Sequence, residues 1–104
     1  MTRLFSVYGD SISSFEGILP QGWRVFFEGE QLELTGVKTP HDTWWGQVIE
    51  HFDGQFLANA SWSGCVVEGR DFPVGASAER IEHLQADGRT PDDILVHIGI
   101  NDYG

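Results

Sequence analysis

The sequence predicts an α/β fold built on a parallel sheet with helices over both faces. Three short continuous apolar runs are typical of strands that are buried on both sides. Two segments with helical spacing of apolar residues separate these runs. The resulting order of strand, helix, strand, helix, strand favours parallel pairing through right-handed crossover connections.

The first half of the chain begins with an apolar run at residues 4–8, which we expect to be a buried strand. Residues 15–41 contain several Gly and Pro, so we expect a long connection, with local strand character at "WRVFF". The segment "DTWWGQVIEHFDG" predicts a helix that Asp42 or Thr43 caps and Gly54 ends. One face of that helix would carry Trp44, Trp45, Val48, Ile49 and Phe52.

The second half repeats this alternation of strand and helix. "QFLANASW" predicts a second strand, and "SAERIEHLQADG" predicts a second helix with Ser77 as its cap and Gly88 at its stop. "TPDDILVHIG" predicts a turn followed by a third strand, whose apolar run covers residues 94–98.

Composition limits the classes of protein and partner. The 104 residues suit one domain, and the net charge of −10 repels nucleic acid. No apolar stretch is long enough to span a membrane and no signal peptide is recognisable, so we expect a cytoplasmic location, which leaves secretion open. A single cysteine, Cys65, excludes an internal disulfide and predicts a small buried thiol. The histidines show no paired spacing that would predict a metal site.

Polar and glycine-rich clusters follow all three expected strands, at residues 9–11 ("GDS"), 59–64 ("NASWSG") and 99–102 ("GIND"). The carboxyl ends of parallel strands lie at one edge of a sheet, where open α/β sheets bind ligands. We therefore expect the three clusters to meet in space although they are far apart in sequence.

The residue types in these clusters suit acyl chemistry. Ser11 places a hydroxyl where a strand runs into a turn or helix, and a helix start favours a developing anion. The next residues, "SSFE", fit a Ser-x-x-Glu capping box. Gly64 can offer a backbone N–H and Asn101 a side-chain N–H, so together with Ser11 they predict an oxyanion hole.

The blocks "GDSIS", "NASWSG" and "GIND" resemble, in order and spacing, the first three sequence blocks of the SGNH (GDSL-type) hydrolases. "TWWGQVIE" followed by "NASWSG" is similar to bacterial esterase-like members. The resemblance implies a three-layer α/β/α fold of flavodoxin-like type, and cleavage of esters, thioesters or acetylated sugars without a cofactor. Ser11 would be the nucleophile, and the N–H groups of Ser11 and Gly64 with the Asn101 side chain would bind the oxyanion. Asp10 and Asp102 fall on family motif positions, where we expect structural hydrogen bonds.

One part of the family pattern is absent. The fourth block, Asp-x-x-His, supplies the general base, and none of the four histidines has Asp three positions before it. The family also continues with further strands. We therefore expect residues 1–104 to be one domain, the N-terminal part of such a hydrolase, with a sheet truncated after its third strand. The edge left there favours a homo-oligomer or strand exchange.

Three alternatives stay open on the sequence. Trp62, beside the oxyanion glycine, suits a substrate wall or plain packing. The chain could be a catalytically inactive fragment, or a carbohydrate-binding module acting through Trp62 and Trp45. A flavodoxin-like nucleotide domain ranks last because "GDSISSFEG" lacks the Gly-x-Gly-x-x-Gly spacing. We expect His97, inside an apolar strand, to be buried rather than to replace the base.

Overall fold

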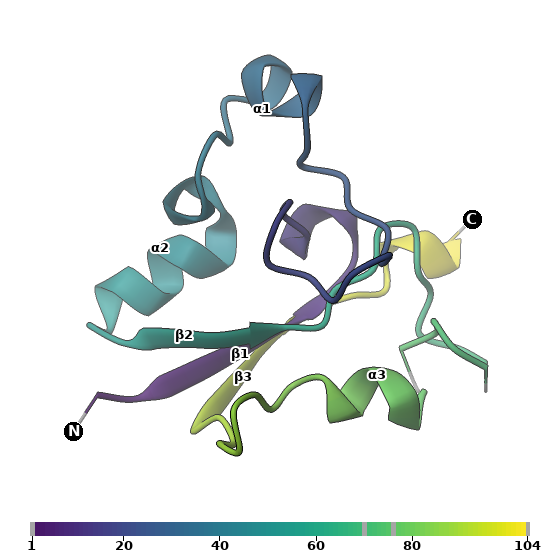
Figure 1. The fold of residues 1–104 in the computed structure, drawn as a ribbon. Helices are drawn as coiled ribbons and strands as arrows, with labels where there is room; N and C mark the ends of the chain where they lie inside the picture. Colours follow the sequence, from purple (N-terminus) through teal and green to yellow (C-terminus); the bar gives the residue numbers. More distant parts are fainter. Residues whose placement is uncertain (1, 70, 76, 104) are drawn as a thin grey trace.

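The computed structural model describes residues 2–69, 71–75 and 77–103, and it contains a parallel sheet of three strands. The strands are β1 (Leu4–Gly9), β2 (Gln55–Asn59) and β3 (Asp93–His97), in the spatial order β2-β1-β3 (Figure 1). Both neighbours pair with β1 in parallel. The predicted α/β fold is confirmed, and the central strand is the one that leads into Ser11.

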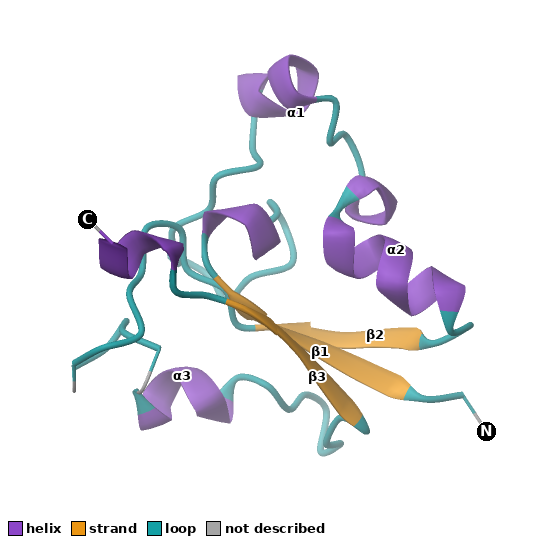
Figure 2. Ribbon diagram, turned by 180° about the vertical axis from the view of Figure 1, so that it is seen from behind, coloured by secondary structure: helices purple, strands orange, loops and turns teal. Residues whose placement is uncertain are grey.

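Helices lie on opposite faces of this sheet, α2 (Trp44–His51) on one and α3 (Ala78–Glu82) on the other (Figures 1 and 2). Successive residues of β1 point to opposite faces. Phe5 and Val7 therefore enter the larger core, with Phe15, Phe27, Trp45 and Ile49. On the α3 face, Tyr8 packs with Ala60 and Leu84, and the Ser6 hydroxyl donates to the Leu84 carbonyl oxygen at 2.6 Å.

The start of α2 is as predicted and its end is not. Thr43 caps the helix, because its hydroxyl oxygen accepts the Gly46 N–H at 3.0 Å. The chain leaves the helix at Asp53, which adopts the left-handed conformation with φ at 52°, and Gly54 does not have this role. Gly54 is needed for another reason: a side chain there would overlap the ring of Phe5. Phe52, expected on the apolar face, is 61% exposed.

The long connection between β1 and α2 contains no strand, so the strand character expected at "WRVFF" is wrong. That segment is held by loop contacts instead, such as the Glu16 N–H to the Phe27 carbonyl oxygen at 3.0 Å. A short helix that the sequence analysis missed, α1 (Glu30–Thr35), follows it and stands away from the sheet (Figure 1). No residue of α1 is fully buried, and only Leu32 packs partly against the larger core, so the helix has too short an apolar stripe to be recognised.

Coverage of the sheet is incomplete at β3. The helix expected over residues 77–88 is confined to α3, and a turn with positive φ at Asp87 and Gly88 follows. Ile94 and Val96 pair with Ser6 and Tyr8 and so share the α3 face, but they stay 47% and 57% exposed. The expectation that both faces are covered is therefore wrong for this strand.

Over the described ranges, no helix has the length and apolar character needed to cross a membrane.

Gly46 gives a test of this packing. Alanine normally stabilises a helix interior by roughly 0.5–1 kcal/mol relative to glycine. A Cβ at Gly46 would overlap the carbonyl oxygen of Pro40 in the preceding turn. We expect Gly46→Ala to lower the free energy of unfolding by about 1–3 kcal/mol in urea denaturation. Gln47→Ala, which removes one exposed side-chain bond, is the control; a higher urea midpoint for Gly46→Ala would contradict the packing.

Candidate active site at the carboxyl ends of the strands

Hydrogen bonds join the three strand-end clusters. The Trp62 N–H donates to the carbonyl oxygen of Gly9 at 3.1 Å, which links the segment after β2 to the end of β1. The Asn101 side-chain N–H donates to the carbonyl oxygen of Cys65 at 2.9 Å. The Asp102 carboxylate accepts the Val67 N–H at 3.0 Å. The segments at 9–11, 61–67 and 99–102 therefore lie at one edge of the sheet, as expected.

Ser11 opens a single 3₁₀ turn, η1 (Ser11–Ser13), and no α-helix begins there. The turn is capped by Asp10, which is fully buried and accepts the Ile12 N–H at 3.3 Å. The capping box expected in "SSFE" is wrong, because the Glu16 carboxylate accepts the Gly29 N–H instead, at 3.0 Å. Any stabilisation of an anion here therefore comes from individual N–H groups, because a full helix dipole is absent.

The turn is held through Ser13, which is buried. The Trp44 indole N–H donates to the Ser13 hydroxyl at 2.9 Å. The Trp45 indole N–H and the Asn59 amide both donate to the Ser13 carbonyl oxygen, at 3.0 Å and 2.8 Å. Gly9 is required beneath the turn, since a Cβ there would overlap the Ser13 hydroxyl. Gly9, Trp44, Trp45 and Asn59 thus hold the turn that contains Ser11. The one signal for these contacts in the sequence is that a buried indole N–H needs a hydrogen-bond acceptor.

The loop after β2 presents Gly64 in the left-handed conformation, with φ at 86°. The Cys65 N–H closes this turn on the Trp62 carbonyl oxygen at 3.2 Å. Within the described residues, the Gly64 N–H donates to no backbone carbonyl, and no heavy atom lies within 4 Å of where its Cβ would stand. The amide of Asn101 has two N–H groups and the bond to Cys65 uses one. Both residues can therefore still donate to a ligand.

Two buried oxygen atoms beside this edge, Asp10 Oδ2 and Ser61 Oγ, have no hydrogen-bond partner among the described residues. Cys65 is buried and free, as expected. Burial raises the pKa of the Cys65 thiol, and the Arg80 guanidinium opposes that rise. Burial also shields this thiol from reagents in solvent.

An aromatic cluster adjoins the glycine loop. The ring centroid of Trp62 lies 5.6 Å from Trp23 and 5.0 Å from Phe72, and Trp23 lies 5.3 Å from Phe72. All three side chains are partly exposed. The cluster could form one wall of a substrate site. The sequence analysis named Trp62 and missed the other two, which nothing in their local sequence connects to it.

The four histidines are all exposed and their rings contact other groups. His41 faces Glu50. His51 contacts the ring of Phe52, His83 contacts Trp23, and His97 contacts Trp44. The expectation that His97 is buried is wrong, because β3 lies at the edge of the sheet. In the described part of the chain, no three His, Cys, Asp or Glu side chains group as a metal site would require.

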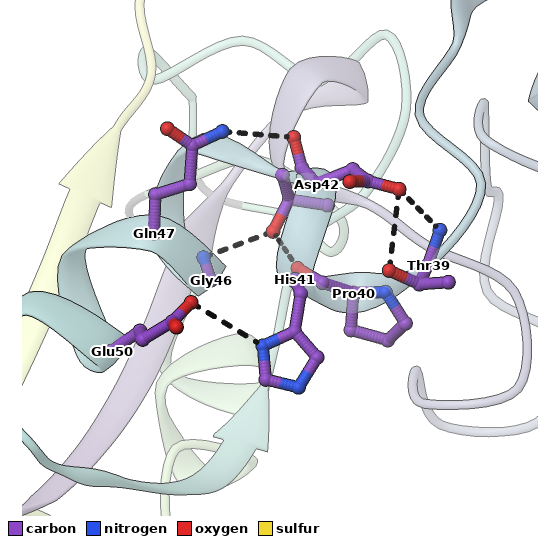
Figure 3. Close-up of polar contacts among 8 residues, drawn as sticks. Thr39, Pro40, His41, Asp42, Gly46, Gln47 and Glu50 are labelled. Atoms are coloured by element: carbon purple, nitrogen blue, oxygen red, sulfur yellow. Dashed lines mark hydrogen bonds and ion pairs between the residues drawn. The ribbon is translucent and has the colours of Figure 1, made fainter.

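A groove of ≈ 430 Å³ lies elsewhere, along α2, and contains none of the predicted catalytic or oxyanion residues. It does contain Trp45, which the carbohydrate-binding alternative named, but that expectation is wrong for Trp45, because only 2% of it is exposed and it cannot stack on a sugar. Its apolar floor includes Trp45, Ile49 and Phe56. At its rim His41 Nδ1 lies 3.8 Å from Glu50 Oε2 (Figure 3). Both side chains are largely exposed, so solvent screens this pair. The groove contains none of the three strand-end clusters, and we place the candidate site at the strand ends.

Comparisons with known proteins bear on the family and the fold of the chain. The family model for GDSL-like lipases and acylhydrolases matches residues 3–103. The fold is similar to the crystal structure of a protein from Bacteroides ovatus ATCC 8483 classed as a GDSL-like lipase, with a TM-score of 0.73 and 26% sequence identity. The match covers 98% of this chain and 50% of that one, so the chain spans about half the length of its solved relative. No curated protein shows significant sequence similarity to the chain.

Proposed function

The chain belongs to the GDSL-like lipase/acylhydrolase family, and from that premise we propose that it carries the nucleophile and the oxyanion site of a serine esterase. The observation that supports this most is the pair of hydrogen bonds at the sheet edge. Trp62 to Gly9 and Asn101 to Cys65 bring the Ser11 turn, the Gly64 loop and the third strand end together. The family supports acylhydrolase activity in general; the assignment of roles is our proposal.

In the proposed reaction, Ser11 Oγ attacks the ester carbonyl carbon while a base takes its proton. The carbonyl oxygen becomes negative and accepts from the N–H groups of Ser11 and Gly64 and from the Asn101 side chain. Collapse of this intermediate breaks the bond to the leaving alcohol, which receives the proton. Water then hydrolyses the acyl-serine by the same steps and restores the hydroxyl. No step needs a cofactor.

We place the general base outside residues 1–104. No histidine here follows Asp at the family's spacing, and the rings of all four contact other groups. Without its base a serine hydrolase loses orders of magnitude in rate, although the oxyanion site alone retains some catalysis.

For the substrate we propose a carboxylic ester or an O-acetyl group on a carbohydrate. The aromatic cluster beside Gly64 supports a ring-shaped group, because sugar faces and aromatic faces pack through apolar contact. A second candidate function rests on the same cluster: a module that binds carbohydrate and does not cleave it.

We also propose that a second copy of the chain pairs with the outer edge of β3. This strand ends the sheet and exposes Ile94 and Val96. An apolar edge of this kind favours pairing with another chain. The partner strand would bury both side chains.

Ser11 is tested with a fluorophosphonate probe, read by intact mass on the 104-residue chain. We expect slow labelling that added imidazole accelerates, because imidazole replaces the missing base. Ser11→Ala should abolish the adduct and Ser63→Ala should keep it. Labelling that survives Ser11→Ala, or no adduct on the folded chain with imidazole present, would contradict the proposal.

Trp62 decides between the two uses of the aromatic cluster. Titration of the chain with unacetylated oligosaccharides, followed by Trp fluorescence, should show weaker binding than the same oligosaccharides carrying O-acetyl groups if an ester is the substrate. Saturable binding that Trp62→Ala removes, together with an unreactive Ser11, would favour the binding module.

The β3 edge is tested by light scattering over a range of concentrations. We expect a dimer that Val96→Lys dissociates, because a buried lysine at the pairing edge is costly. Leu34→Lys, at an exposed position of α1, is the matched control. A compact monomer at every concentration would rule out this contact.

A further inference from the structure

Arg80, on the short helix α3, is fully buried although it carries a charge. Its Nη2 donates to the Gly9 carbonyl oxygen at 2.9 Å and to the Ala60 carbonyl oxygen at 2.6 Å. Its Nη1 donates to the Pro73 carbonyl oxygen at 2.9 Å and to Cys65 Sγ at 3.1 Å. The Nε donates to Ala60 as well, at 3.2 Å. These acceptors are carbonyl oxygens and one sulfur, with no carboxylate among them.

Two of the four residues bonded to Arg80 lie next to proposed oxyanion donors in the sequence. Gly9 is two residues before Ser11, and Cys65 directly follows Gly64. The Gly9 carbonyl also accepts the Trp62 N–H at 3.1 Å and the Cys65 thiol at 3.6 Å, so three separate donors hold the same oxygen. The Cys65 carbonyl in turn accepts from Asn101. Arg80 therefore contacts the supports of all three groups that would bind the oxyanion.

We propose that Arg80 is a positioning residue that sets the distance between the Ser11 turn and the Gly64 loop. This inference rests on the proposed esterase function. The planar guanidinium offers five N–H donors in a fixed fork, so one group can hold several carbonyls at set separations. Small displacements of an active site cost large factors in rate, which gives this distance its importance.

Plain core packing is the competing explanation. Burying a charge is costly unless it is well hydrogen-bonded, so a core position would tolerate an apolar residue at lower cost. Here every guanidinium nitrogen has an acceptor, and the Tyr8 ring lies 4.5 Å from the central carbon. Lysine could keep the charge and lose the fork, which makes Arg80→Lys the informative variant.

The first measurement is amide hydrogen exchange on the intact chain. In Arg80→Lys, we expect the Trp62 and Cys65 amides to exchange at least about tenfold faster, while amides of β1 keep their protection relative to global unfolding. Val7→Ala, which weakens the core on the α2 face and leaves the bonds of Arg80 intact, is the control for a general loss of stability. Unchanged exchange at both amides in Arg80→Lys would overturn the inference.

The second measurement is fluorophosphonate labelling of Ser11 with imidazole, separated into a saturation constant and a maximal rate. Arg80→Lys should lower the maximal rate by roughly one to two orders of magnitude and leave the saturation constant unchanged. Val7→Ala should change neither. A labelling rate equal to the parent's would overturn the role of Arg80 and leave the esterase proposal standing. If the unsubstituted chain is never labelled, the esterase proposal is contradicted instead. Hydrogen exchange would then still test whether Arg80 holds the Ser11 turn and the Gly64 loop together.

If Arg80→Lys fails to fold, the unsubstituted chain still decides the question. Nitrogen-15 spectra of the arginine side chains should show separate, slowly exchanging Nη1 and Nη2 signals for Arg80, because each nitrogen bonds different acceptors. A single averaged signal would mean that the fork is not held, and would overturn the inference.

Discussion

The carbonyl oxygen of Gly9 is the point on which the candidate site depends. It ends the central strand, and it accepts the Trp62 N–H at 3.1 Å and Arg80 Nη2 at 2.9 Å. Because a buried carbonyl must be paired, these bonds fix the loop after β2 and helix α3 against the end of β1. The neighbouring turn is fixed from the other face of the sheet, where Trp44, Trp45 and Asn59 donate to Ser13. Ser11 is thus held from both sides by polar contacts.

Much of the fold could be predicted because it depends on local signals. Apolar runs located all three strands, and Thr43 was one of the two residues predicted to cap the helix at 44–51. The errors occurred where tertiary contacts decide. "WRVFF" has strand composition but no strand beside it, and Gly54 serves a close approach to Phe5 that no local pattern reveals. His97 was expected to be buried because its strand is apolar, whereas the position of β3 at the sheet edge leaves it exposed.

The same distinction holds at the site. Ser11, Gly64 and Asn101 lie in short blocks that follow strands, so the sequence could predict that these blocks meet at one edge of the sheet. Arg80 could not be found in this way, because in "SAERIEHL" it looks like an ordinary solvated charge. Its importance comes from bonds to residues up to 71 positions away. Trp23 is similar, since only the folded chain brings it against Trp62.

The central claim is that Ser11, Gly64 and Asn101 act on one oxyanion. The most direct test compares amide spectra of the nitrogen-15-labelled chain before and after phosphonylation of Ser11, with the Asn101 side-chain signals assigned. The account predicts that the backbone N–H signals of Ser11 and Gly64 and one Asn101 side-chain proton all move downfield, as donors to the bound oxygen do. A change confined to Ser11, with Gly64 and Asn101 unmoved, would contradict it.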